Sequence, residues 1–538
     1  MSLDIYDKVM TLAKRRGFLY PSFEIYGGVA GFYDYGPLGV QMKHNLENLW
    51  RRYYILGENC LEIDTPTITP YEVLKASGHV DEFTDITGEC PRCKTYYKVE
   101  NPEEAICPKC GSKLENLHPV NLMFPTTIGV GNTREAFLRP ETAQGIFTSF
   151  HLLYRYAREH LPFGVVQLGR GYRNEISPRQ GPIRMREFSM AEAEIFFDPN
   201  DKTHPRFKEV KDEKIRLYDN IQEQTLTLEE AVNKRVVKSE ALAYYLYLTQ
   251  SFLIEAGVDP EKLRFRKHTS DELAHYAQEC WDAELYSERF GWIECVGVAD
   301  RSAYDLEAHT RSSGVELTAS RRYYKPRRIK QKRIIPDMRR LGPMFKDKAG
   351  RIKETLEELT PSPDEEEIKI IVDGEEMIIP RECYEIKEIE ETITLERFTP
   401  HVIEPSYGID RILYCILEHS YYETEKKGEE YRLLKLKPVI APIKTGVFPL
   451  VNDERLVTIA KKIDKELRSK GIQTYYDNSG SIGRRYARMD EIGTPYCITI
   501  DHQTLEDNTV TVRDRDTTKQ ERIHIDKLLD YFREKILL

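Results

Sequence analysis

Cysteine is scarce in this chain, and long apolar runs are missing from it. Ten cysteines among 538 residues are too few for a disulfide scaffold. A membrane-spanning helix needs about 18 consecutive apolar residues, and no stretch of the sequence approaches that length. The N-terminal residues also lack the apolar core and the cleavage site of a secretory signal. We therefore expect a cytoplasmic protein with no membrane partner.

A positive net charge and a phosphate-binding loop are missing as well. The formal net charge is −10, which argues against a grip on nucleic acid along the whole chain, because such binding uses Lys and Arg clustered against phosphates. The pattern GxxxxGK does not occur, and neither do internal repeats or low-complexity tracts. Any contact with RNA must therefore be local.

The length of the chain exceeds what one hydrophobic core usually spans, so we expect at least two domains. Residues 438–538 change to short apolar strands that alternate with helices, which predicts a separate α/β domain. The segments expected in it are strands at 439–443, 472–476 and 496–500 and a helix from about Asp453.

Residues 1–437 mix helices and strands without a regular βαβ alternation. This pattern predicts an α+β domain built on an antiparallel sheet with helices around it. Three segments are expected as insertions in this domain: a cysteine-containing segment at about 86–118, a helical and charged segment at 200–280, and a charged segment at 321–391 with a basic first half and an acidic second half.

The most informative stretch is VVQLGRGYRNEISPRQGPIRMREFSMAEAEIFF, residues 165–197. It predicts two strands joined by a long polar loop. Side chains at every second position of a strand share a face, so cations, one aromatic ring and acids gather together. They are Arg173 and Glu175 on one side of the loop and Arg186, Phe188, Met190, Glu192 and Glu194 on the other.

Two interpretations fit this hairpin. A charged face in contact with solvent is the ordinary one, because strands of a sheet covered on one side alternate in this way. The ring of Phe188 among the charges favours a nucleotide site instead. A base can stack on such a ring while guanidinium groups hold phosphate in bidentate fashion.

Two further stretches decide between these interpretations. They are LRPETAQGIF at 138–147 and HVIEPSYGIDRILYCILEH at 401–419, where Gly408 and Arg411 precede an apolar helix. Arg411 taken alone reads as a surface residue. With the hairpin, however, the chain resembles class II aminoacyl-tRNA synthetases, the hairpin being similar to their motif 2 and residues 401–419 to motif 3. LRPETAQGIF, RNEISPR and REF resemble specifically the glycyl-tRNA synthetases of the archaeal and eukaryotic-like dimeric type.

The resemblance implies an ATP site with two catalytic arginines. Arg173 is expected to hold the α-phosphate while the glycine carboxylate attacks it, and Arg411 to meet the γ-phosphate. Glu175 would read the adenine amino group, and Phe188 would stack on adenine. Adenylation needs positioning and charge neutralisation rather than a covalent nucleophile. The remaining residues expected at ATP are Asn174, Arg184, Arg186, Glu316 and Leu317, with Glu316 as a ligand of Mg²⁺.

Glycine offers no side chain to hold, so its ammonium group must be recognised and anything larger excluded. Acidic residues suit that task. The resemblance assigns it to Glu141, Met190, Glu192, Glu404, Ser406 and Gly408. Glycine also has no smaller competitor, which is consistent with the lack of a recognisable editing domain.

Two CxxC pairs stand out among the cysteines. Cys90 and Cys93 are separated by thirteen residues from Cys107 and Cys110, a spacing close to that of zinc ribbons. Four thiolates make a closed structural Zn²⁺ site with no open position for catalysis. Redox-active or unmetallated thiols are the alternative.

The resemblance also concerns RNA binding and assembly. Residues 480–501 resemble the anticodon-binding domain of several class II synthetases, where Arg484, Arg485 and Arg488 either contact RNA phosphates or form a solvated basic face. The basic run 321–340 is a second candidate for tRNA contact. The helix 40–52 and the strand 60–66 resemble motif 1, which implies a homodimer, although their apolar positions fit plain core equally well.

These observations predict a glycine–tRNA ligase that activates glycine with ATP and transfers it to the 3′ end of its tRNA. A class II-like paralogue that binds nucleotide or RNA without charging tRNA is the first alternative. A synthetase for another small amino acid and a zinc-ribbon nucleic-acid binder are the others. The intact Arg173, Glu175, Phe188 and Arg411 argue against the paralogue.

Overall fold

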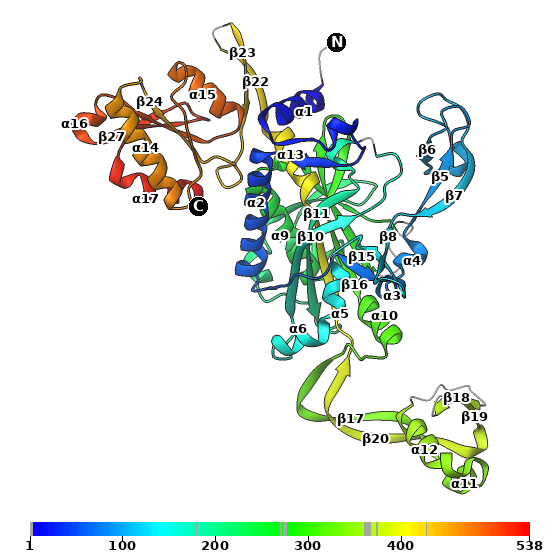
Figure 1. Cartoon of the computed structure of the whole chain (residues 1–538). Helices are drawn as coiled ribbons and strands as arrows, with labels where there is room; N and C mark the ends of the chain where they lie inside the picture. The colour runs from blue at the N-terminus through cyan, green and yellow to red at the C-terminus, as the bar shows by residue number, and fades with distance from the viewer. Residues whose placement is uncertain are drawn as a thin grey trace. The chain divides into compact units, whose positions relative to one another are not determined.

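Figure 1 shows the computed structural model of the chain. The residues that it describes are 4–178, 180–269, 272, 277–359, 367–372, 375–426 and 428–537. The chain divides into two compact units, of which the larger comprises Met1–Leu317 and Thr399–Leu538 and the smaller Thr318–Phe398. Among the described residues, no helix combines the length and the apolar character that crossing a membrane requires.

A nine-stranded sheet in the order β13-β12-β14-β15-β16-β21-β11-β10-β3 is the framework of the larger unit. All neighbours are antiparallel except β12 with β14 and β10 with β3. The predicted antiparallel sheet is thereby confirmed. The strands are β3 (Leu61–Glu62), β10 (Phe163–Tyr172), β11 (Glu187–Phe197), β12 (Lys214–Tyr218), β13 (Glu223–Thr227), β14 (Leu263–Lys267), β15 (Glu279–Ser287), β16 (Gly291–Ser302) and β21 (His401–Gly408).

Helices pack into the core beside this sheet, among them α2 (Pro37–Arg51), α9 (Glu240–Ala256) and α13 (Ile409–Ser420). Helix α9 is buried over most of its circumference, as a helix with so few polar residues requires. Tyr407 of β21 ties the layers together, because its hydroxyl lies 2.8 Å from the hydroxyls of both Tyr54 and Thr249. The central strands are thus held on one side by packed aromatic residues.

The segment at 200–280 is not the helical insertion that the sequence predicts. It contains α9, but β12, β13 and β14 in the same segment are strands of the nine-stranded sheet. Their alternating burial, as in Ile215 and Leu217, places one face in the core. The charged residues between these apolar positions had suggested exposed helices, whereas they are the solvent-facing positions of strands.

Shorter elements surround the sheet. The cysteine-containing segment forms a small sheet in the order β6-β5-β7. These strands are β5 (Thr84–Glu89), β6 (Tyr96–Lys98) and β7 (Glu115–Asn121). The other elements are α1 (Ile5–Arg16), β1 (Leu19–Pro21), β2 (Tyr33–Tyr35), β4 (Ile68–Pro70), α3 (Tyr71–Ala76), α4 (His79–Glu82), β8 (Phe124–Ile128), β9 (Arg134–Leu138), α5 (Ala143–Thr148), α6 (Phe150–Tyr156), α7 (Phe207–Val210), α8 (Leu228–Asn233), α10 (Tyr304–Ser313), β22 (Tyr421–Lys426) and β23 (Glu429–Leu434).

The C-terminal residues form a five-stranded sheet in the order β25-β24-β26-β27-β28 with its own core. The predicted strand at 439–443 is wrong, because the first strand of this sheet begins at Thr445. Ile440 and Ala441 instead end a turn, and their carbonyls accept hydrogen bonds from Asn45 of α2. The elements are β24 (Thr445–Pro449), α14 (Glu454–Ser469), β25 (Thr474–Tyr476), α15 (Ile482–Glu491), β26 (Tyr496–Ile500), α16 (Thr504–Asp507), β27 (Thr509–Asp514), β28 (Gln520–His524) and α17 (Leu528–Leu537).

The smaller unit is a long two-stranded ribbon that carries a compact tip. Its strands β17 (Ala319–Pro336) and β20 (Tyr384–Phe398) are antiparallel. The tip consists of α11 (Met338–Phe345), α12 (Ala349–Glu358), β18 (Glu367–Val372) and β19 (Glu375–Pro380) around a small core. The basic half of the predicted charged segment is β17, and it pairs with the acidic half in β20.

Candidate active site

A cavity of about 160 Å³ lies on the central strands of the large sheet. Strands β11, β16 and β21, the start of α13 and the loop between β10 and β11 all contribute to its walls. The predicted residues among its lining are Arg173, Glu175, Arg184, Phe188, Met190, Ser406, Gly408 and Arg411. The hairpin that the sequence predicts is therefore correct, and it forms a cavity wall rather than a solvent-exposed face.

Arg173 lies between two aromatic rings. Its guanidinium carbon is 5.3 Å from the ring centres of both Phe188 and Phe83, and its Nε donates to the carbonyl of Pro140 at 3.4 Å. Cation–π contact on two sides orients a planar cation without neutralising it. The charge of Arg173 is thus available to an anion in the cavity.

The loop between β10 and β11 is fixed by its own charged residues. Arg184 donates from Nε to Glu175 at 2.6 Å. Arg186 donates to the backbone carbonyls of Glu175 and Ala30. The backbone N–H of Asn174 donates to Leu122 at 2.7 Å. Asn174 and Arg186 do not line the cavity, so their part here is to hold the loop in place.

Arg411 reaches the cavity from the first turn of α13. Its Nε donates to the carbonyl of Ile183 at 2.9 Å, and one terminal nitrogen donates to the carbonyl of Glu294 at 2.7 Å. The neighbouring Asp410 accepts from the backbone N–H of Ser189 on β11 at 2.5 Å and from Tyr35. These contacts attach the helix to the strand that carries Phe188.

A second pocket of about 180 Å³ adjoins the first and shares Arg173, Glu294, Gly297 and Ser406 with it. It is rich in acids. Glu141, Glu192, Glu404 and Ser406, four of the residues predicted for glycine, line it. Met190 and Gly408, the other two, line the first cavity instead.

Hydrogen bonds hold two of these carboxylates in place. Glu192 accepts from the backbone N–H of Thr142 at 2.7 Å, from the Thr142 hydroxyl at 2.5 Å and from the Ser406 hydroxyl at 2.9 Å. Glu141 accepts from Gln144 at 2.8 Å and lies 3.3 Å from Nε2 of His79. Both side chains are therefore oriented before any substrate arrives.

Arg301 is the cation inside this group of acids and is almost fully buried. It donates to both carboxylate oxygens of Asp305, at 2.8 and 2.9 Å, and to Glu404 at 2.7 Å. Glu194 stands beside Glu404 on the neighbouring strand and is also buried. Within the described part of the chain, neither carboxylate oxygen of Glu194 has a hydrogen-bond partner.

Burial and charge separate the pKa values of these acids. Burial raises the pKa of Glu404 to about 8, with Arg301 acting in the opposite direction. Burial also raises the pKa of Glu192, helped by the charge of Glu141. Burial acts upward on the pKa of Glu141 too, but His79 and Arg301 outweigh it and leave that pKa below its usual value. The pocket thus combines an ionised acid with acids that resist ionisation.

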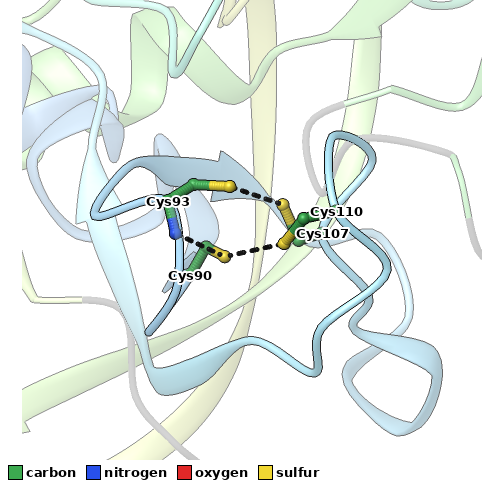
Figure 2. Close-up of side chains that lie close together, drawn as sticks. All are labelled: Cys90, Cys93, Cys107 and Cys110. Atoms are coloured by element: carbon green, nitrogen blue, oxygen red, sulfur yellow. Dashed lines mark hydrogen bonds between the residues drawn. The ribbon is translucent and has the colours of Figure 1, made fainter.

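The four cysteines of the CxxC pairs come together in the small sheet of β5 to β7. Figure 2 shows their side chains pointing toward one another. Cys90 Sγ is 3.5 Å from Cys110 Sγ, and Cys93 Sγ is 3.9 Å from Cys107 Sγ. A tetrahedral Zn²⁺ with Zn–S bonds of about 2.3 Å would place its sulfur atoms roughly 3.8 Å apart. The four thiols therefore fit a zinc ion.

Comparisons with known proteins agree with this geometry. The tRNA synthetase class II core domain (G, H, P, S and T) matches residues 127–314, and the anticodon binding domain matches residues 438–535. A glycine–tRNA ligase of Methanothrix thermoacetophila is 50% identical over 99% of this chain and 97% of its own. One of Methanocaldococcus jannaschii is 48% identical over the whole of both chains.

The chain belongs to the glycine–tRNA ligase family. Its fold, a class II core followed by an anticodon-binding domain, is also that of solved synthetase structures. A Giardia lamblia prolyl-tRNA synthetase in complex with prolyl-adenylate has a TM-score of 0.54 and 14% identity, covering 98% of this chain and 75% of that one. A Cryptosporidium parvum structure titled as the RNA binding domain of threonyl-tRNA synthetase has a TM-score of 0.54 and 17% identity, covering 98% of both chains.

Glu316 and Leu317, which the resemblance places at ATP, lie outside the two pockets. Glu316 is exposed beyond the end of α10, and Leu317 is buried with its N–H donating to Thr310 at 3.1 Å. The family resemblance of GVELTAS suggested this pair, and their contact with the nucleotide stays a prediction.

Sequence reasoning missed several charged residues of the site, and Glu294 and Arg301 are two of them. Glu294 on β16 lines both the cavity and the pocket, and Arg301 on the same strand holds two of the acids. The signal was available, since each is a charged residue within a mostly apolar strand of twelve residues. Such residues face a polar partner or a ligand when their neighbours are buried.

Proposed function

We propose that this chain activates glycine with ATP and transfers the glycyl group to the 3′ end of its tRNA. The observation that carries the proposal is the junction of two pockets of different character. Arg173, Arg184 and Arg411 face the first cavity, and acids predominate in the second pocket. Arg173 belongs to both, so an anion held by it lies next to whatever the acids bind.

The first cavity, which contains Phe188 and the three arginines, suits ATP. The adenine ring would stack on Phe188, with Glu175 accepting from its amino group. Arg173 would neutralise the α-phosphate, and Arg411 with Arg184 the outer phosphates. The glycine carboxylate oxygen attacks the α-phosphorus, the bond to the β-phosphate oxygen breaks, and pyrophosphate leaves, so fixed positive charges stabilise the developing negative charge.

Mg²⁺ would further neutralise the phosphates in this cavity. Glu294 is the acid placed for it, because its carboxylate stands at the junction of both pockets and is more than half exposed. Carboxylate oxygens are the ligands that this ion prefers in proteins. We therefore assign to Glu294 the role that the sequence gave to Glu316.

The acidic pocket suits the glycine ammonium. Glu141 keeps its negative charge, and Glu192 and Ser406 are fixed by mutual hydrogen bonds. An ammonium group has three donors and requires acceptors at fixed positions. Arg301 and Glu404 complete the wall beside these acids.

Zn²⁺ held by Cys90, Cys93, Cys107 and Cys110 would be structural, because four sulfur ligands fill its coordination shell. The C-terminal domain would bind the tRNA anticodon. Within it, Arg485 is buried and donates to the carbonyls of Pro449 and Gly480, so its predicted phosphate contact is excluded. Exposed Arg484 and partly exposed Arg488 remain candidates.

Assembly and location complete the proposal. We place the enzyme in the cytoplasm as a homodimer. The apolar positions of α2 that resemble motif 1, such as Leu46 and Trp50, are packed in the core of this chain, so they do not form the dimer contact. The exposed apolar residues Ile25 and Tyr26 are better placed to do so.

Amino-acid-dependent ATP–pyrophosphate exchange, measured without tRNA for all twenty amino acids, tests the central proposal. Exchange with glycine alone is the expected result. Exchange with another amino acid would mean that the acidic pocket has a different ligand. No exchange by folded, metal-loaded protein would favour a paralogue that binds nucleotide without activating an amino acid.

A further inference from the structure

The cysteine-containing sheet touches the nucleotide cavity. We name residues 84–121 the cysteine module, and residues 173–178 with 180–186 the nucleotide loop. Leu122, directly after the module, accepts a hydrogen bond from the nucleotide loop at Asn174 and donates to Phe83 at 3.1 Å. The two ends of the module are thus paired with each other and with the loop that holds the catalytic arginine.

The tip of the module contacts the same loop at a second point. The Ser177 hydroxyl donates to the backbone carbonyl of Tyr96 at 2.5 Å. Tyr96 follows directly on the first cysteine turn, where the backbone N–H of Cys90 donates to the carbonyl of Thr95 at 2.9 Å. The position of this acceptor is therefore set by the turn that carries Cys90 and Cys93.

Asp85 of β5 makes the third contact. One of its oxygens is paired with Lys98 of β6 at 2.9 Å, and the other lies 3.6 Å from a terminal nitrogen of Arg184. In the described part of the chain that second oxygen is buried and has no hydrogen-bond partner. Arg184 is bonded to Glu175 instead.

This arrangement has a consequence for ATP binding. Glu175 must accept from the adenine amino group, yet Arg184 occupies one of its oxygens. Arg184 has further N–H donors, and its terminal nitrogen lies 3.6 Å from the unpartnered oxygen of Asp85, which is therefore the nearby acceptor if adenine shifts the bond to Glu175. A buried carboxylate oxygen gains most from such a bond, because an unsatisfied buried acceptor is costly.

We propose that the cysteine module is a positioning element of the ATP site, in which Asp85 receives Arg184 and Tyr96 fixes Ser177. Phe83 adds to it, because its ring centre lies 5.3 Å from the guanidinium carbon of Arg173, as far as that of Phe188. The metal bound by the four cysteines then sets the affinity for ATP as well as the fold of the module. This inference rests on the ATP site proposed above.

The variants Asp85→Asn and Ser177→Ala test the inference in metal-loaded, full-length protein. Each should raise KM for ATP in pyrophosphate exchange by roughly two- to fivefold, the effect of losing one partly screened polar contact. KM for glycine and kcat should stay near the values of the unmodified protein. Asp85→Glu, which keeps the charge, should recover part of the ATP affinity.

Glu104→Gln is the matched control, because Glu104 is an exposed acid of the same module. If Asp85→Asn and Ser177→Ala behave like this control while their zinc content is unchanged, the inference is wrong. The affinity of each variant for ATP is also measured directly by calorimetry. This measurement separates failure of the inference from failure of the proposed function. Lack of glycine-dependent exchange by the unmodified protein would count against the function, whereas equal ATP binding by all variants would count against the module.

Metal removal provides an independent readout. After chelation we expect weaker ATP binding and faster amide hydrogen exchange in the nucleotide loop, while α9 in the distant core stays protected. The inference would be overturned if the metal-free protein kept slow amide hydrogen exchange in α9 and bound ATP with unchanged affinity. Restored affinity on adding Zn²⁺ alone would support it.

Discussion

Arg173 is the residue on which both pockets depend. Its guanidinium lies between two rings and lines both cavities, so its planar shape matters as much as its charge. Lysine has the same charge but cannot stack or donate in bidentate fashion. Replacing Arg173 by lysine therefore tests whether catalysis depends on the planar shape of the guanidinium or only on its charge.

The variant Arg173→Lys should lower kcat/KM for glycine-dependent exchange by roughly 100-fold or more, the scale seen when a donor to a developing charge is lost. Arg170 lies in β10, the strand that leads to Arg173, but outside both pockets. The variant Arg170→Lys should change kcat/KM by less than about twofold. Steady-state exchange kinetics measure both. Equal effects of the two variants would remove Arg173 from the catalytic role.

The raised pKa of Glu404 predicts that the stability of the fold depends on pH. Its carboxyl keeps a proton in the folded state up to about pH 8, whereas an ordinary carboxyl with a pKa of 4.5 has released it. Across that window the folded state binds more protons than the unfolded state, so this group's contribution to the unfolding free energy falls as pH rises.

The variant Glu404→Gln should therefore show a shallower decrease of Tm between pH 5 and 8 than the unmodified protein, a range of about 3 units set by the raised pKa. Thermal unfolding followed by calorimetry at several pH values measures it. Parallel curves for the two proteins would mean that Glu404 ionises normally.

At the scale of elements, the ribbon of β17 and β20 carries opposite charges on its two strands. Lys330 of β17 pairs with Glu388 of β20 at 3.2 Å, whereas Arg327 and Arg328 are exposed. A basic strand can attract RNA phosphates, but the acidic strand beside it weakens that attraction. The net effect of the ribbon on tRNA affinity can be measured by neutralising either the basic strand or the acidic strand.

Neutralising Arg327, Arg328 and Lys330 to Ala should lower affinity for tRNA by roughly three- to tenfold and reduce its salt dependence. ATP–pyrophosphate exchange should not change, since the ribbon lies outside the catalytic cavities. Changing Glu385, Glu388 and Glu390 to Gln should have the opposite effect on tRNA affinity. Filter binding at several salt concentrations measures both, and unchanged affinity in the basic variant would exclude this contact.

Elements also differ in how well the sequence predicts them. The hairpin at 165–197 was predicted because its two strands are long and separated by a clear polar loop. The strands of the 200–280 segment were not, because short strands with charged outer positions resemble exposed helices in composition. The stretch 439–443 is as apolar as a strand, yet Ile440 and Ala441 are buried in the main core and form a turn.

At the scale of the whole molecule, the exposed segment 23–29 is the strongest candidate for the dimer contact. Ile25 and Tyr26 are 88% and 85% exposed, which is unusual for adjacent large apolar residues. The double variant Ile25→Asp/Tyr26→Asp should shift a dimer to monomers in light scattering. Ile221→Asp, at another exposed apolar residue, should not. A dimer that persists in the double variant would place the interface elsewhere.

The sequence alone determined the family, the antiparallel sheet, the hairpin, the four-cysteine cluster and a part of the residues in the two pockets. It could do so because these features depend on neighbours along the chain: the period of a strand, the spacing of CxxC pairs and the order of residues within a motif. Arg173, Phe188 and Arg411 lie where the motifs predict.

Only the tertiary structure decided which residues meet across strands. It placed Glu294 in the walls of both pockets, because β16 lies between β15 and β21 inside the nine-stranded sheet. It also brought Asp85 and Tyr96 against a loop some eighty residues later in the chain. Local patterns carry no information about such pairings, since they result from how the strands pack together.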